Sequence, residues 1–292
     1  MKASYYEASA RERLAGLLDP GSFTEILPPR ERVTSPHLKQ LDTPAAFDDG
    51  VVVGQGRLDG RPVLAAAQEG GFMGGAVGEV HGAKLTGLLE RALDSRPTAV
   101  LLLVESGGVR LHEANAGLIA VSEIMRAVLT VRGAGIPVIV LDGGQFGCFG
   151  GMGIVSRLCD TVIISEEGRL GLSGPEVIET TCGVEEFDSR DRALVWRTVG
   201  GKHRTLLGEA GTLVADDIGA FRNAAIDALS LTPDLSLAAL EAEHVFLGRR
   251  IERFGDCKDG TDIWRRLGIE NPERLPLLEA DDFNAAIAGK RA

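Results

Sequence analysis

The chain has 292 residues, of which 44% are hydrophobic and 25% are charged, and its formal net charge is −11. This balance is typical of a globular protein with one large core or two modest ones, and it excludes a disordered chain. The negative charge argues against nonspecific binding to nucleic acids, which depends on cationic side chains that meet phosphates.

The four cysteines, Cys148, Cys159, Cys182 and Cys257, form no C-x-x-C pair and have no zinc-ribbon spacing. We therefore predict neither a disulfide framework nor a metal site. Residues 1–15 carry charges at short intervals and lack the apolar run of a signal peptide, and no apolar stretch is long enough to span a bilayer. We expect a cytoplasmic protein without a membrane span.

The N-terminal pattern predicts an amphipathic helix over residues 8–18, ended by Asp19-Pro20-Gly21. A proline-containing arm follows, of the kind that often wraps a neighbouring subunit. We assign residues 1–50 to this helix and arm. Residues 51–58 and 62–67 then read as two strands joined by Asp59-Gly60, which is a strong signal for a β-hairpin.

From there the chain alternates between strands and helices with short connections. We predict helices over 77–93 and 112–132. The apolar residues expected on the buried face of the second helix are Leu118, Ile119, Ile124, Met125, Val128 and Leu129. Strands are predicted over 98–104, 137–141 and 161–165, and a further helix begins near Pro175.

This order favours an α/β spiral built from strand, strand and helix over a dinucleotide-binding fold with one leading glycine fingerprint. Residues 235–248 look helical. We therefore divide the chain into residues 1–50, a spiral domain over 51–232, and a C-terminal helical extension over 233–292.

Two glycine-rich turns follow predicted strands, at residues 105–110 and 147–153. Glycine lets a ligand approach main-chain N–H groups without a Cβ in the way, so two such turns can aim donors at one developing negative charge. Gly150 and Gly151 also stand where a helix should begin, where free N–H groups favour an anion or a polarised carbonyl. Taken singly, each turn is equally well explained as a tight connection without a ligand.

Other reactive residues carry weaker signals. Cys148 with His112 or His81 as a base would resemble a nucleophilic pair, but a small buried side chain is the better interpretation of that cysteine. Glu105 and Glu176 are possible acid or base groups, although they do not stand out as a carboxylate pair.

One cationic cluster is a candidate for holding the phosphates of a carrier, and a solvated cationic edge is its commoner explanation. Its members are Arg197, Lys202, His203 and Arg204.

Several segments resemble acyl-CoA carboxyltransferase subunits of the crotonase superfamily. Residues 106–113, Ser-Gly-Gly-Val-Arg-Leu-His-Glu, resemble the Ser-Gly-Gly-Ala-Arg-x-x-Glu turn of that family, and residues 72–78 and 168–178 resemble two more of its motifs. The zinc-ribbon cysteines of acetyl-CoA carboxylase β subunits are missing. Residues 143–153 and 200–204 are most similar to the β subunits of malonate decarboxylases, particularly the biotin-independent type.

The resemblance implies a crotonase-like β-β-α spiral that pairs with a homologous γ subunit, with the active site between the two. It also implies an acyl-carrier subunit and an acyl-carrier transferase subunit. The substrate would be a malonyl thioester on a dephospho-CoA-derived group of the carrier, with no cofactor bound directly. Decarboxylation would give an acetyl-thioester enolate and CO2.

Within this picture we expect Gly107, Gly108, Gly150 and Gly151 to stabilise the thioester oxyanion through their N–H groups. We expect the substrate to be bound by Ser106, Arg110, Gly74 and Gly75.

Three alternatives stay open at this point. A biotin-dependent acyl-CoA carboxyltransferase β subunit would hand the CO2 of the same enolate to biotin. A crotonase-type hydratase or isomerase would need a pair of acidic side chains that the sequence does not place. A non-catalytic scaffold would only hold a partner enzyme.

Overall fold

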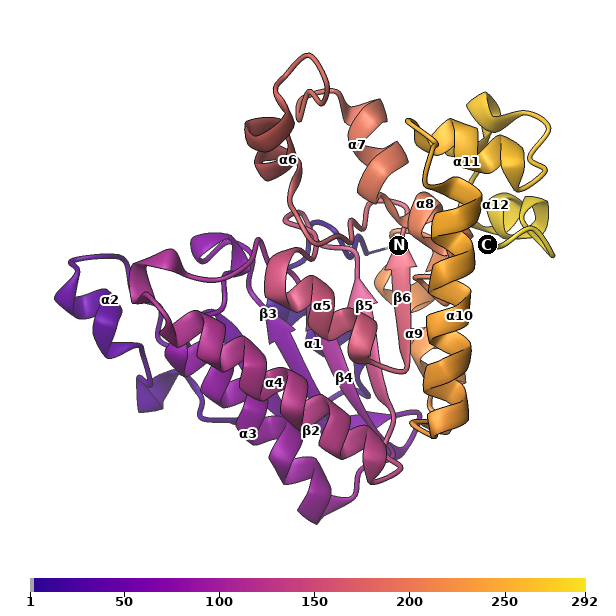
Figure 1. Cartoon of the computed structure of the whole chain (residues 1–292). Coiled ribbons are helices and arrows are strands. Elements are labelled where there is room, and N and C mark those ends of the chain that lie inside the picture. The colour runs from indigo at the N-terminus through magenta and orange to yellow at the C-terminus, as the bar shows by residue number, and fades with distance from the viewer. Residues whose placement is uncertain (1–2) are drawn as a thin grey trace.

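The structure, a computed structural model, describes residues 3–292 (Figure 1). Its centre is one seven-stranded sheet in which the strands lie side by side in chain order. The strands are β1 (Thr24–Ile26), β2 (Val51–Leu58), β3 (Arg61–Gln68), β4 (Ala99–Val104), β5 (Val138–Asp142), β6 (Thr161–Ser165) and β7 (Thr212–Val214).

The sheet is mixed. β1, β2 and β3 pair antiparallel, whereas β3 through β7 pair parallel. The predicted hairpin is confirmed: Asp59 and Gly60 both have positive φ, 52° and 74°, as a two-residue turn between antiparallel strands requires. Because β3 to β6 are parallel, the loops that leave them gather at one edge of the sheet.

Helices cover both faces of this sheet (Figure 1). α1 and α9 lie behind it in this view, and α3, α4 and α5 lie in front, while α6 and α7 project above the edge where the parallel strands end. The helices are α1 (Ala10–Leu17), α2 (Pro36–Gln40), α3 (Glu79–Ser95), α4 (Ala116–Gly133), α5 (Gly150–Leu158), α6 (Pro175–Cys182), α7 (Arg192–Val199), α8 (Gly201–Leu206), α9 (Ile218–Ala228), α10 (Leu237–Phe254), α11 (Gly260–Arg266) and α12 (Ala280–Ala286).

Two hydrophobic cores lie on opposite faces of the sheet. Along β4, Leu102 belongs to the core under α3 and α4, and its neighbour Leu101 belongs to the core under α1 and α9. This alternation explains why the central strands are continuous apolar runs, since a strand buried on both faces needs apolar residues at every position.

Both ends of the chain join these cores. Tyr5 and Leu14 pack in the core that α1 and α9 share, and Trp264 and Phe283 pack in the core on the other face. The first helix therefore covers the chain's own sheet. The division of the chain at residues 50 and 232 stays a prediction.

The buried face of α4 agrees with our prediction only in part: Ile124 and Val128 are fully buried. Leu118, Ile119 and Leu129 are 55%, 62% and 40% exposed. Small residues also lie on the face that packs inward, and α3 and α4 approach closely there: a Cβ on Gly82 of α3 would overlap the Cβ of Ala120. Leu118, Ile119 and Leu129 thus lie on the outer surface of α4.

Within residues 3–292, no helix is long and apolar enough to cross a membrane. The same part of the chain contains no group of three or more His, Cys, Asp or Glu side chains that could hold a metal ion.

Candidate active site

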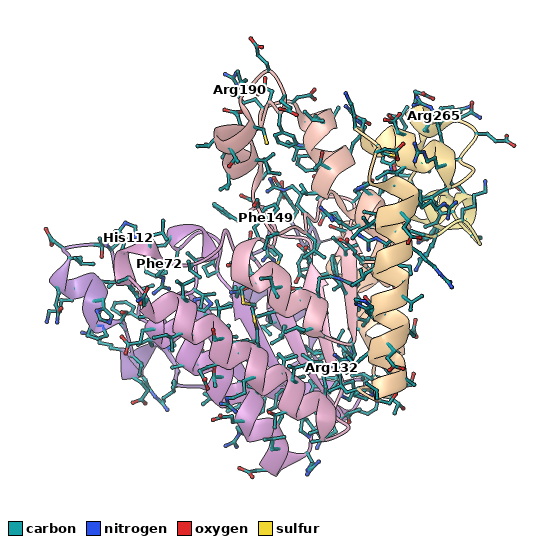
Figure 2. All side chains as sticks on the ribbon, in the orientation of Figure 1. Phe72, His112, Arg132, Phe149, Arg190 and Arg265 are labelled. Atoms are coloured by element: carbon teal, nitrogen blue, oxygen red, sulfur yellow. The ribbon has the colours of Figure 1, made fainter. Side chains whose placement is uncertain are left out.

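The two glycine turns meet at the edge where the parallel strands end. Ser106 of the first turn donates its N–H to the Gly147 carbonyl at 2.7 Å, and its own carbonyl accepts the N–H of Phe149 at 2.8 Å. Gly150 faces the first turn so closely that a Cβ on it would lie 3.0 Å from the Cα of Gly108. Figure 2 shows Phe149 at the start of α5, with Phe72 and His112 near the same edge.

Two of the four expected oxyanion donors already have partners. The N–H of Gly107 donates to the Gly74 carbonyl at 2.8 Å, and the N–H of Gly150 donates to the Leu172 carbonyl at 2.9 Å. These bonds tie each turn to a neighbouring loop. In this structure, Gly107 and Gly150 therefore shape the site, and their amides are not free to meet a ligand.

The N-terminus of α5 supplies free donors. Gly151 and Met152 stand in its first turn, and their N–H groups have no hydrogen-bond partner among the described residues. The N-cap, Phe149, has no side chain that could cap the helix. Free amides and the helix dipole together favour negative charge here. The N–H of Gly108 lies nearby, in a long 3.3 Å hydrogen bond to Ser106 Oγ.

Ser106 of the first turn, and Gly74 and Gly75 of the neighbouring loop, shape the backbone around the site. Ser106 is fully buried, and its hydroxyl also donates to the Gly108 carbonyl at 3.2 Å, which fixes the Gly107–Gly108 peptides. Gly74 and Gly75 both have positive φ, and a Cβ on Gly75 would overlap the Glu105 carbonyl. Contact of these three residues with substrate stays a prediction.

Arg110 is placed differently from what the resemblance led us to expect. Its side chain is wholly buried, and its guanidinium forms ion pairs with Asp49 at 2.8 Å and Glu113 at 3.1 Å. It also donates to the Asp49 carbonyl at 2.7 Å and lies over the ring of Phe72. Arg110 therefore holds the residues around the first turn together, and we no longer assign it a contact with substrate.

Glu105, which precedes Ser106, is a buried carboxylate at the centre of the site. One of its oxygens pairs with Arg13 of α1, and the other accepts the N–H of Phe146 in the loop before α5 at 3.2 Å. Because Arg13 neutralises the charge, this carboxylate belongs to a buried ion pair and is not a free acid or base.

The structure places the other reactive candidates away from any nucleophilic role. Cys148 is fully buried with its sulfur 3.3 Å from Ser156 Oγ, and burial raises the pKa of its thiol well above the usual value. Our interpretation of Cys148 as a small buried side chain is confirmed. His81 is buried between Gln68 and Asp49, whereas His112 is exposed.

The cationic cluster of α7 and α8 serves packing. Lys202 donates to the carbonyls of Pro276 and Leu278, and Arg204 pairs with Glu209. His203 is buried and accepts a hydrogen bond from the indole of Trp264 at 3.1 Å. Arg197 pairs with Asp259 at 3.1 Å, so each of the four residues has a partner within the chain. Contact of this cluster with a carrier stays a prediction.

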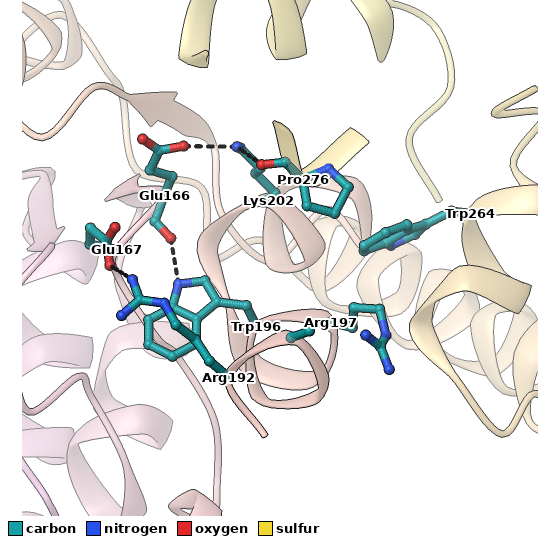
Figure 3. Close-up of a pocket in the computed structure, with 9 residues that line it drawn as sticks. Glu166, Glu167, Arg192, Trp196, Arg197, Lys202, Trp264 and Pro276 are labelled. Atoms are coloured by element: carbon teal, nitrogen blue, oxygen red, sulfur yellow. Dashed lines mark hydrogen bonds and ion pairs between the residues drawn. The ribbon is translucent and has the colours of Figure 1, made fainter. Parts of the chain in front are cut away.

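A cavity of about 400 Å³ opens beside this cluster, between α7 and the C-terminal segment (Figure 3). Its charged groups neutralise one another: Lys202 pairs with Glu166 and Arg192 pairs with Glu167, each at 2.8 Å. Neither glycine turn lines it. We therefore place the candidate active site at the turns and not in this cavity.

Asp142 is a polar residue that sequence reasoning missed. It ends β5 with its side chain fully buried, and neither carboxyl oxygen has a hydrogen-bond partner among the described residues. Burial raises the pKa of this carboxyl well above its usual value. The sequence does carry a signal for this residue, because Asp142 is an acidic residue at the end of an otherwise apolar strand.

The comparisons with known proteins agree with this geometry. The family model of the carboxyl transferase domain matches residues 7–234. The chain belongs to the carboxyl transferase family. Its fold is the crotonase-like spiral that the motifs predicted.

Three members of the family are informative. Over 97% of this chain and 95% of the relative, it is 41% identical to the malonyl-S-ACP:biotin-protein carboxyltransferase MADC of Malonomonas rubra. A Pseudomonas malonate decarboxylase hetero-tetramer in complex with malonate contains a chain that superposes with a TM-score of 0.82 at 40% identity, covering 91% of this chain and 97% of that one. The acetyl-coenzyme A carboxylase carboxyl transferase subunit beta of Fusobacterium nucleatum is 34% identical, but over 61% of this chain and 60% of its own.

Proposed function

We propose that this chain is the β subunit of a malonate decarboxylase and supplies the oxyanion-binding half of its active site. The observation that carries the proposal is the start of α5, where the free N–H groups of Gly151 and Met152 lie beside the Gly108 turn. The similarity to MADC and to the Pseudomonas chain extends over nearly the whole length, whereas the acetyl-CoA carboxylase subunit matches a smaller part.

The substrate is a malonyl thioester on a small acyl-carrier subunit. The bond between its methylene carbon and its carboxylate breaks, the carboxylate leaves as CO2, and the electron pair moves into the thioester to form an enolate. A proton added to the carbon then gives the acetyl thioester, so the reaction is that of a carbon–carbon lyase. The N–H groups of Gly151 and Gly108 stabilise the enolate oxygen, and each such donor contributes about a hundredfold to a thousandfold in rate.

The carrier's thioester arm is the dephospho-CoA-derived group that the resemblance implies, and an acyl-carrier transferase subunit loads it. In this proposal the chain itself binds no cofactor directly. A cytoplasmic location also stays a prediction.

Exposed apolar side chains around the site support a protein partner there. A large exposed apolar surface is typical of a region that another protein covers. The partner we propose is a homologous γ subunit that completes the site, in line with the hetero-dimer and hetero-tetramer of the Pseudomonas malonate decarboxylase. The exposed residues are Leu111 (82%), Leu118 (55%), Ile119 (62%), Phe146 (42%), Ile154 (42%), Leu172 (68%) and Val177 (57%).

A biotin-dependent carboxyltransferase is the second candidate, and the name of MADC favours it, because that relative transfers the carboxyl group to a biotin protein. Both functions use the same enolate and the same donors. They differ in the fate of CO2, which is released in one case and attached to biotin in the other.

Reconstitution separates these functions. We would measure CO2 release from malonyl-carrier by this chain alone, by the chain with its γ partner, and by the pair with a biotin carrier protein. Release by the biotin-free pair, but not by the single chain, supports the decarboxylase. Turnover only with the biotin protein shifts the assignment to the carboxyltransferase, and full activity of the single chain refutes a shared site.

A further inference from the structure

The Glu105 carboxylate lies between the first glycine turn, α1 and the loop that leads into α5. Its own residue leads into the first glycine turn, Arg13 reaches it from α1, and Phe146 donates to it from the loop that leads into α5. A Cβ on Gly70 or on Gly144 would clash with its carboxyl group, so both backbones pack directly on it. No other acidic group considered above joins both turns.

We propose that Glu105 is a positioning residue that fixes the second glycine turn, and with it the free N–H groups of α5, relative to Gly108. This inference rests on the proposed function. Glu105 acts by holding the loop that carries the donors in place. It assigns Glu105 no contact with substrate.

The hydrogen bonds explain how one carboxylate sets this geometry. Consecutive residues of the first turn hold consecutive residues of the second: Glu105 Oε1 accepts the Phe146 N–H, and the Ser106 N–H donates to the Gly147 carbonyl. Phe146 is itself 42% exposed, so its side chain does not anchor this loop in the core. Without the acceptor at Glu105, the loop keeps the Ser106–Gly147 and Phe149–Ser106 bonds to the first turn, and Arg169 still holds it from the other side through the Cys148 N–H and the Gln145 carbonyl. The Phe146 N–H would have no acceptor, so the segment before Gly147 is the part we expect to loosen.

The ion pair with Arg13 offsets the cost of burying the charged Glu105 carboxylate beside the oxyanion site. An unpaired carboxylate beside the oxyanion site would oppose the negative charge of an enolate, and burying it alone would be costly. The guanidinium neutralises that charge, and its Nε also donates to the Tyr5 carbonyl at 2.9 Å. If Arg13 is replaced together with Glu105, the charge of Glu105 can be removed without leaving an unpaired cation. Its role as a hydrogen-bond acceptor can then be tested by itself.

Two double variants of the full chain, assembled with its partner, test this inference. E105Q/R13M removes both charges and keeps an oxygen that accepts the Phe146 N–H, whereas E105M/R13M removes both charges and the acceptor. Both avoid an unpaired buried charge, so both should fold, which thermal unfolding would check. We expect kcat of E105M/R13M to fall about a hundredfold below that of E105Q/R13M with KM within threefold, since a misplaced donor weakens binding of the transition state only.

Hydrogen exchange of the peptide covering residues 144–149 gives a readout that needs no substrate. We expect exchange there to be at least tenfold faster in E105M/R13M than in E105Q/R13M, with exchange in β4 and α4 unchanged. Equal exchange and equal kcat in the two variants would overturn the positioning role. A wild-type assembly that released no CO2 would refute the proposed function, while the exchange comparison would still decide the role of Glu105.

Discussion

Removing the free N–H of Gly151 should slow catalysis without unfolding the chain. Proline lacks this donor and fits the first turn of a helix, and Gly151 is not among the residues with positive φ. Space is the obstacle, because a Cβ on Gly151 would lie 2.6 Å and 2.8 Å from the two methyl groups of Val121. The substitution V121A removes both methyl groups and leaves the Val121 Cβ at 3.2 Å.

The informative pair of variants is therefore G151P/V121A and its control G151A/V121A. Both add a Cβ at residue 151 and both lose the Val121 methyl groups, so their packing is closely matched. They differ in the N–H, whose loss from an oxyanion site costs about 2.7–4 kcal/mol of transition-state stabilisation, or roughly a hundredfold to a thousandfold in kcat.

The assay is CO2 release from malonyl-carrier by each variant, assembled with the partner and checked for complex formation. We expect KM to stay within a few fold, because the thioester oxygen gains its negative charge only as the enolate forms and not in the bound substrate. If G151P/V121A turned over within threefold of G151A/V121A, Gly151 would not be an oxyanion donor.

Three further predictions concern the surroundings of the site. R110M should lower the free energy of unfolding by about 3–5 kcal/mol in urea, because it leaves the buried carboxylates of Asp49 and Glu113 without their cation. A raised KM at unchanged stability would instead indicate that Arg110 contacts the substrate. I119E should weaken binding of the partner at least tenfold in calorimetry while the chain alone unfolds as before, and unchanged affinity would place the partner elsewhere. Burial lowers the pKa of His203 to about 3, so the folded chain keeps this histidine neutral while the unfolded chain protonates it below pH 6.5. The free energy of unfolding of wild type relative to H203Q should therefore fall by about 1.4 kcal/mol per pH unit as the pH is lowered from 6.5 toward 3. A difference that does not change with pH would contradict the burial argument.

Much of the fold followed from local pattern. The hairpin at Asp59-Gly60 and the apolar run of β4 were predicted correctly, because turn residues and burial on both faces leave direct traces in the sequence. The buried face of α4 was predicted only in part, with Ile124 and Val128 placed correctly. Leu118 and Ile119 are apolar yet exposed, and periodicity alone cannot distinguish a core from a surface that another subunit covers.

The site was predicted less completely than the fold. The glycine motifs located both turns, but whether an amide is free depends on carbonyls that other loops bring to it. Gly74 and Leu172 take the N–H groups of Gly107 and Gly150. The pairing of Glu105 with Arg13 joins residues 92 positions apart, and no local pattern indicates it. Hydrogen-bond partners of this kind appear only with the tertiary structure.

Exchange of the methyl protons of an acetyl thioester with solvent tests the central claim most directly. An assembly that forms the enolate during decarboxylation must also form it from the product, so it should incorporate deuterium into acetyl-carrier in D2O without CO2 or biotin. We predict exchange by the wild-type pair, exchange by G151A/V121A, and at least a hundredfold slower exchange by G151P/V121A. A wild-type pair that releases CO2 from malonyl-carrier but leaves the acetyl methyl group unlabelled would contradict an enolate stabilised by these glycine turns.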